Sequence, residues 1–131
     1  MRGQPTAIML LIGLMCLVRF GLAAYGYLLP TALMAQLAAP AADNLQMPYI
    51  IRVWAVRDMV LAVLVATAGP AMIRTLLIAC IAIDATDIVS AWLSGRAGLF
   101  DPAATLSLMT TAIAALVPES LALLLIGRRR A

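Results

Sequence analysis

The chain has 131 residues, of which 65% are hydrophobic and only 11% are charged, and its mean hydropathy is +1.06. So few polar residues cannot cover a water-soluble domain, and the composition therefore indicates an integral membrane protein with the lipid bilayer as its main partner. All nine basic residues are arginine and there is no histidine. A histidine-based metal site, haem ligation by imidazole and a histidine general base are excluded.

Four apolar runs are long enough to cross a bilayer, and they cover residues 7–29, 49–68, 72–93 and 103–126. Pro30 ends the first run, Gly69 and Pro70 reverse the chain after the second, and Asp101 followed by Pro102 forms a helix N-cap before the fourth. A cleaved signal peptide is the alternative for the first run, but Arg19 interrupts it. We predict an all-α, polytopic four-transmembrane-helix bundle that forms one domain over residues 1–131.

The connections between the runs predict the topology. Residues 30–48 are expected to form an outer loop, with room for a short interfacial helix. Arg2, Arg74 and the arginines at 128–130 fall on one side of the predicted bundle, and Arg96 falls on the other. By the positive-inside rule, we expect a multi-pass protein of the cell membrane with both termini in the cytoplasm. The terminal arginines suit a membrane-surface anchor rather than a nucleic-acid partner.

Charged residues lie at similar depths in three of the predicted spans. Counted from the outer helix ends at 1.5 Å per residue, Arg19 lies about 15 Å deep, Arg57 and Asp58 about 12 to 14 Å, and Asp84 and Asp87 about 9 to 13 Å. An ionised side chain that faces lipid costs at least about 2.5 kcal/mol. We therefore predict an Arg/Asp network inside the bundle.

Other polar residues are assigned relative to this network. Trp54 shares a helix face with Asp58, and Thr110 lies at a depth from which it can hydrogen-bond into the network. Glu119, which follows Pro118, is expected in the inner half as a structural pair with Arg74. The two arginines and three aspartates leave an excess of negative charge, which a proton, Arg52, or a bound cation or ligand would balance.

Three segments resemble a known family. Residues 52–62 (Arg-x-x-x-x-Arg-Asp-x-x-x-Ala) and 83–87 (Ile-Asp-Ala-Thr-Asp) are similar to the "G-x-R-D" and "D-x-x-D" segments of the DUF4267 family, small four-helix membrane proteins related to the DoxX-like group. Residues 19–21 (Arg-Phe-Gly) extend the resemblance. Ala55 and Val56 stand where glycine is expected. The resemblance implies four helices and important roles for Arg57, Asp58, Asp84 and Asp87, but names no substrate. DoxX-like relatives include accessory subunits of quinone-linked oxidoreductases.

Three functions are considered. The first is a non-catalytic protein that binds a small apolar or lipid-like ligand, or serves as an accessory subunit in a homo-oligomer or membrane complex. The second is an intramembrane enzyme in which Asp58, Asp84 or Asp87 acts as acid or base in opening or isomerising an epoxide. The third is proton-coupled transport. No metal or cofactor is expected, because Cys16 and Cys80 lie singly in apolar runs.

Overall fold

The computed structural model describes residues 6–37 and 43–128, which form helices and their connections. The helices are α1 (Thr6–Leu28), α2 (Pro30–Gln36), α3 (Met47–Thr67), α4 (Ile73–Arg96) and α5 (Pro102–Gly127). The all-α prediction is confirmed for this part of the chain. Each of the four long helices begins and ends within three residues of the corresponding predicted run.

The helix ends follow local chemistry. The carboxylate of Asp101 accepts a hydrogen bond of 2.7 Å from the backbone N–H of Ala104, and Pro102 occupies the first turn of α5, where a proline nitrogen leaves no donor unsatisfied. Residues 30–48 contain α2, whose Pro30 and Met34 are buried. A short helix therefore does form in this connection, and it packs against α1 and α3.

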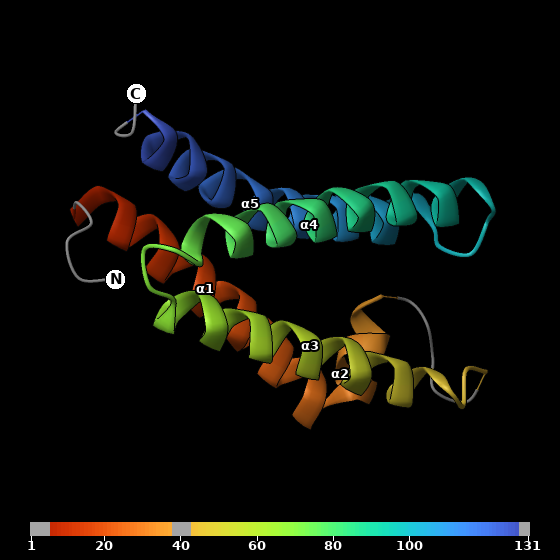
Figure 1. The fold of residues 1–131 in the computed structure, drawn as a ribbon. Helices are drawn as coiled ribbons and strands as arrows, with labels where there is room; N and C mark the ends of the chain where they lie inside the picture. Colours follow the sequence, from red (N-terminus) through yellow and green to blue (C-terminus); the bar gives the residue numbers. More distant parts are fainter. Residues whose placement is uncertain (1–5, 38–42, 129–131) are drawn as a thin grey trace.

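The long helices form two pairs, α1 with α3 and α4 with α5 (Figure 1). One end of the molecule holds the start of α1, the end of α5 and the α3–α4 turn, and we call it the terminal end. The other end holds α2 and the α4–α5 connection, and we call it the loop end. The two pairs lie close together toward the terminal end and diverge toward the loop end (Figure 1).

Burial follows the same division. All four long helices contribute to one apolar core toward the terminal end, made of Ile8, Ile12, Met15, Cys16, Ala62, Val65, Ala68, Ile73, Leu77, Cys80, Ala122 and Ile126. The buried residues nearer the loop end lie outside this core and belong to separate helix groups. They are Ala23, Gly26, Pro30, Met34, Ile51 and Ala55 in α1, α2 and α3, and Ala91 and Ala104 in α4 and α5. The shared apolar core therefore joins the two pairs only toward the terminal end.

The α4–α5 pair packs closely at Gly95. A Cβ atom added at this glycine would lie 2.5 Å from Oγ1 and 2.7 Å from Cγ2 of Thr105. Such distances are far below van der Waals contact, so only glycine fits without displacement. Close approach of two helices at a small residue is a common feature of packing within membranes.

Three of the described helices, α1, α4 and α5, are long and apolar enough to cross a membrane. Large hydrophobic side chains such as Leu10, Leu17 and Leu106 are exposed on their outer faces. These features fit a membrane protein. The 21-residue α3 also has sufficient length, but it carries Arg52, Arg57 and Asp58.

Candidate functional site

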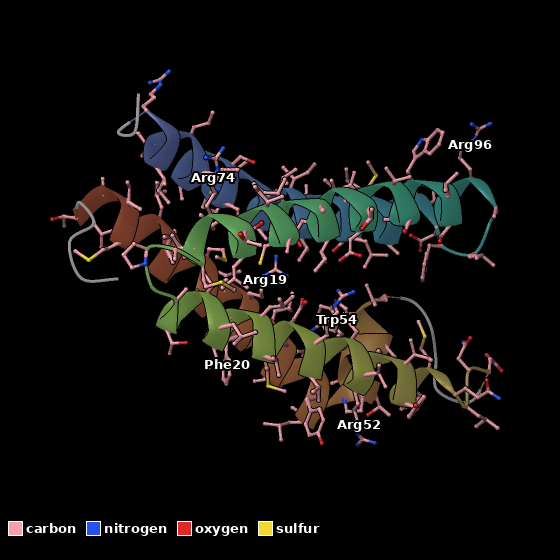
Figure 2. The ribbon with its side chains drawn as sticks, in the orientation of Figure 1. Arg19, Phe20, Arg52, Trp54, Arg74 and Arg96 are labelled. Atoms are coloured by element: carbon pink, nitrogen blue, oxygen red, sulfur yellow. The ribbon has the colours of Figure 1, made fainter. Side chains whose placement is uncertain are left out.

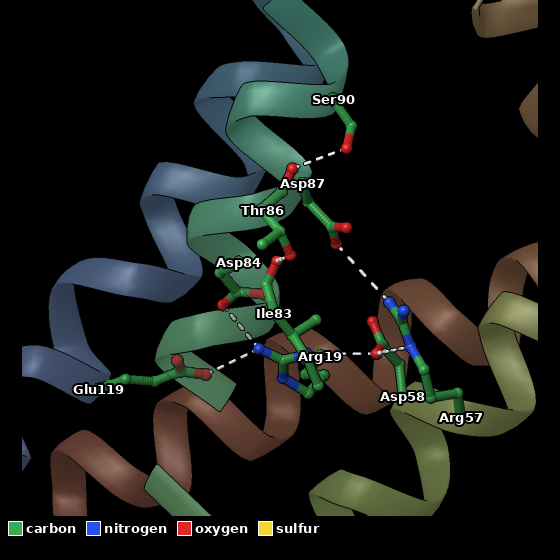
Figure 3. Close-up of polar contacts among 9 residues, drawn as sticks. All are labelled: Arg19, Arg57, Asp58, Ile83, Asp84, Thr86, Asp87, Ser90 and Glu119. Carbon is green, nitrogen blue, oxygen red and sulfur yellow. Dashed lines mark hydrogen bonds and ion pairs between the residues drawn. The ribbon is translucent and has the colours of Figure 1, made fainter. Parts of the chain in front are cut away.

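A buried arginine connects all four long helices. The guanidinium of Arg19 in α1 donates from Nη1 to Asp58 Oδ1 at 3.2 Å, and from Nη2 to Asp84 Oδ2 at 2.6 Å and Glu119 Oε1 at 2.8 Å (Figure 3). The acceptors come from α3, α4 and α5 respectively. We call these four residues the Arg19 cluster. The predicted buried network is confirmed, and it includes a glutamate.

The helical repeat explains why the carboxylates face inward. In α3, Asp58 belongs to a buried stripe with Ile51, Ala55, Ala62 and Val65, whose members are three or four residues apart. Residues at these spacings lie on one helix face. The stripe that buries α3 against its neighbours thus also brings the carboxylate of Asp58 to Arg19.

The same spacing operates in α4. Asp84 continues a buried stripe that contains Ile73, Leu77 and Cys80. Only 4% of Asp84 is exposed, and only 5% of Arg19. Both charged groups are therefore placed among apolar residues of the bundle, where contact with an opposite charge is needed to offset the cost of leaving water.

A second, weaker ion pair lies beside the Arg19 cluster. Arg57 contacts Asp58 Oδ1 through Nε at 3.4 Å, and Asp87 Oδ2 through Nη2 at 3.6 Å (Figure 3). The side chains of Arg57 and Asp87 are 43% and 41% exposed, whereas that of Asp58 is 8% exposed. The Arg57–Asp87 pair thus forms the accessible part of the network.

The network contains more acidic than basic groups. Two guanidinium groups face four carboxyl groups, those of Asp58, Asp84, Asp87 and Glu119. Arg52, considered above as a balancing charge, is exposed and donates through Nε to the backbone carbonyl of Tyr27 at 3.3 Å. It satisfies a carbonyl near the end of α1 and does not balance the network.

The expected pair of Arg74 and Glu119 is corrected by this geometry. Glu119 is fully buried and contacts Arg19, whereas Arg74 is exposed near the start of α4 (Figure 2). Counting from the outer end places Glu119 about 26 Å along its helix, far deeper than Arg19. Counted from the terminal end, Glu119 lies about 12 Å along α5 and Asp84 lies about 16 Å along α4. The two residues therefore have similar depths when this end is the reference.

Two other predicted members of the network lie apart from the Arg19 cluster. The hydroxyl of Thr110 is exposed and donates to the carbonyl oxygens of Leu106 and Ser107 in the preceding turn of α5. Trp54 is half-buried and packs toward α1, where a Cβ added at Gly26 would lie 3.3 Å from its ring. A threonine hydroxyl commonly donates to a carbonyl oxygen of its own helix, as that of Thr110 does. Sequence spacing alone does not reveal whether it does so or bonds to another helix.

The three candidate catalytic aspartates all contact arginine: Asp58 and Asp84 contact Arg19, and Asp87 contacts Arg57. A pocket of about 230 Å³ lies elsewhere, on α1 and α3, and is lined by Phe20, Met59, Val60, Val63 and Leu64. Among the described residues, no group of histidine, cysteine or acidic side chains is arranged to hold a metal ion. The site offers paired carboxyl groups and an exposed ion pair.

No family model, curated protein or solved structure matches this chain. The resemblance to the DUF4267 family therefore stays a prediction.

Proposed function

We propose that the chain crosses the membrane four times and binds the polar end of a lipid-like or small apolar molecule at Arg57 and Asp87, between its two helix pairs. The Arg19 cluster joins the pairs, and the Arg57–Asp87 pair provides the binding group. The observation that carries the proposal is that the side chains of Arg57 and Asp87 are nearly half exposed, although they lie beside the buried Arg19 cluster.

The arrangement of α3 supports its role as the fourth span. Its 21 residues give a length of about 31 Å, which matches the hydrocarbon thickness. Asp58 contacts Arg19, and Arg57 contacts Asp87. Arg52 lies about 8 Å from the loop end of α3, so its long side chain can extend to the polar interface. All three charges of α3 therefore have a compatible position in a membrane.

The common position of the helix ends supports the proposed topology. The start of α1, the end of α5 and the α3–α4 turn lie together (Figure 1), and in the sequence these ends carry most of the arginines. The positive-inside rule assigns this terminal end to the cytoplasm. Reporter fusions before residue 1 and after residue 131 should both report the cytoplasm. A reporter outside at either end would contradict the topology.

The Arg57–Asp87 pair has the chemistry of a binding site. Exposed charges at membrane depth are costly, and they mark binding sites and pathways more often than lipid-facing surface. The distance of 3.6 Å leaves both side chains loosely joined, so a polar head group can insert between them or bridge them. Exposed valine, leucine and isoleucine residues of α3 and α4 offer contacts for an apolar tail.

The experiment compares what copurifies with four forms of the full chain, which are the unmodified protein, Arg57→Gln, Asp87→Asn and Arg96→Gln. Native mass spectrometry and lipid analysis identify the bound molecules and also count the chains in each complex. Arg96 is a matched control, because it is exposed and stacks on Trp92 at 5.0 Å, away from the network.

We expect a bound molecule in the unmodified protein and in Arg96→Gln, and its loss in Arg57→Gln and Asp87→Asn. Identical ligand content in all four forms would overturn the proposal. In that case the ion pair would serve only to hold the helices together, as intramembrane polar groups often do.

A further inference from the structure

Two carboxyl groups in the Arg19 cluster share a single donor atom. Oδ2 of Asp84 and Oε1 of Glu119 both accept from Nη2 of Arg19, at 2.6 and 2.8 Å (Figure 3). Carboxylates held this close repel each other when both are ionised, and such a pair commonly keeps one proton. The same guanidinium also contacts Asp58, so its one positive charge faces three acidic groups.

An unpartnered oxygen identifies where the proton is bound. Glu119 is 0% exposed, and its Oε2 atom has no hydrogen-bond partner in the structure. An ionised carboxylate would place part of its negative charge on this oxygen in apolar surroundings, which is costly. The neutral acid avoids that cost.

We propose that Asp84 and Glu119 form a proton-binding site at the centre of the bundle, with one exchangeable proton held on Glu119. In the binding step, a proton leaves water and bonds to a carboxylate oxygen, and the negative charge of the cluster falls by one. No other bond changes. The buried carboxyl groups thereby have a function that is separate from ligand binding at Arg57 and Asp87.

The charges and thiols around Glu119 come from three helices. α1 contributes Arg19 and Cys16, α3 contributes Asp58, and α4 contributes Cys80 and Asp84. Arg57 and Asp87 lie further out. Both thiols are buried. Of the nearest charges, only Arg19 favours ionised Glu119, whereas both aspartates favour its neutral form.

The proton exchanges with the loop-end side. Toward the terminal end, the site is closed by the apolar core that includes Ile12, Leu77 and Ala122. Toward the loop end lies Asp87, whose side chain is 41% exposed and is connected to Asp58 through Arg57. The most exposed members of the network therefore lie on the side of Asp87, and this side is the proposed route of the proton.

The sequence offers a direct test, because Glu119 is its only glutamate. We would label the full chain with glutamate carrying ¹³C at its carboxyl carbon, incorporate it into lipid nanodiscs, and record the carboxyl signal by NMR as a function of pH. The expected result is a neutral carboxylic acid at pH 7 that ionises reversibly at higher pH. A carboxylate signal at pH 7 would overturn the proposal without any mutation.

Two variants test whether the proton is shared. In Asp84→Asn, the titration midpoint of the Glu119 signal should move to lower pH, because the negative neighbour is gone and Arg19 remains. Asp101→Asn is the control, since Asp101 is an exposed cap outside the network, and it should leave the midpoint unchanged. An unchanged midpoint in Asp84→Asn, or an equal shift in both variants, would overturn the shared site.

Discussion

Replacing Arg19 should cost far more stability than replacing Arg57. Arg19→Gln removes the only described positive group that contacts Asp84 or Glu119, and it also removes one contact of Asp58. Breaking a buried ion pair from one side costs about 3 to 5 kcal/mol, because the remaining charge stays buried. Arg57 is 43% exposed, and its contacts are 3.4 and 3.6 Å long, so Arg57→Gln should cost only about 0 to 1 kcal/mol.

The free energies of unfolding can be compared in mixed micelles with increasing sodium dodecyl sulfate, using fluorescence of Trp54 and Trp92. The control is a variant in which all four residues of the Arg19 cluster are replaced together by uncharged ones. Its substitutions are Arg19→Gln, Asp58→Asn, Asp84→Asn and Glu119→Gln. It should recover most of the loss, since no buried charge remains in the cluster. If Arg19→Gln is no less stable than Arg57→Gln, Arg19 is not the centre of a buried charge network.

Further predictions concern helix packing and helix ends, all measured by the same unfolding assay. Gly95→Ala should destabilise the protein by about 1 to 3 kcal/mol through overlap with Thr105, and the added change Thr105→Ala should restore much of the loss. Gly21→Ala is the matched control, because nothing lies within 4 Å of its added Cβ, and equal effects at both glycines would exclude a specific clash. Asp101→Ala should cost about 1 kcal/mol through loss of the α5 cap, whereas Asp101→Asn, which keeps an acceptor oxygen, should cost less.

The helices were largely predictable because their signals are local. Apolar runs of about 20 residues, the proline at 30, the Gly69–Pro70 turn and the Asp101–Pro102 cap all act on neighbouring residues. The pairing of α1 with α3 and of α4 with α5 was not predictable in this way. It depends on contacts between different helices, such as Gly95 with Thr105 across the α4–α5 connection and Gly26 with Trp54 across α2.

The site was predictable in part for a similar reason. The cost of burying charge indicated that Arg19, Asp58 and Asp84 must meet, and they do. The partner of Glu119 was missed because depths were counted from one end of helices that differ in length and inclination. α1 runs obliquely to the α4–α5 pair (Figure 1), so equal residue counts do not give equal depth. The long side chain of Arg19 then bridges the remaining separation.

The Arg19 cluster also joins residues that are synthesised at different times. Arg19 is synthesised first, and its partners follow 39, 65 and 100 residues later. In the proposed four-span topology, Arg19 has Asp58 as a partner as soon as α1 and α3 are inserted, so the first two spans already contain a paired arginine. The α4–α5 hairpin brings Asp84 and Glu119 to the same nitrogen, Nη2 of Arg19. A single arginine thus connects the last half of the protein to α1.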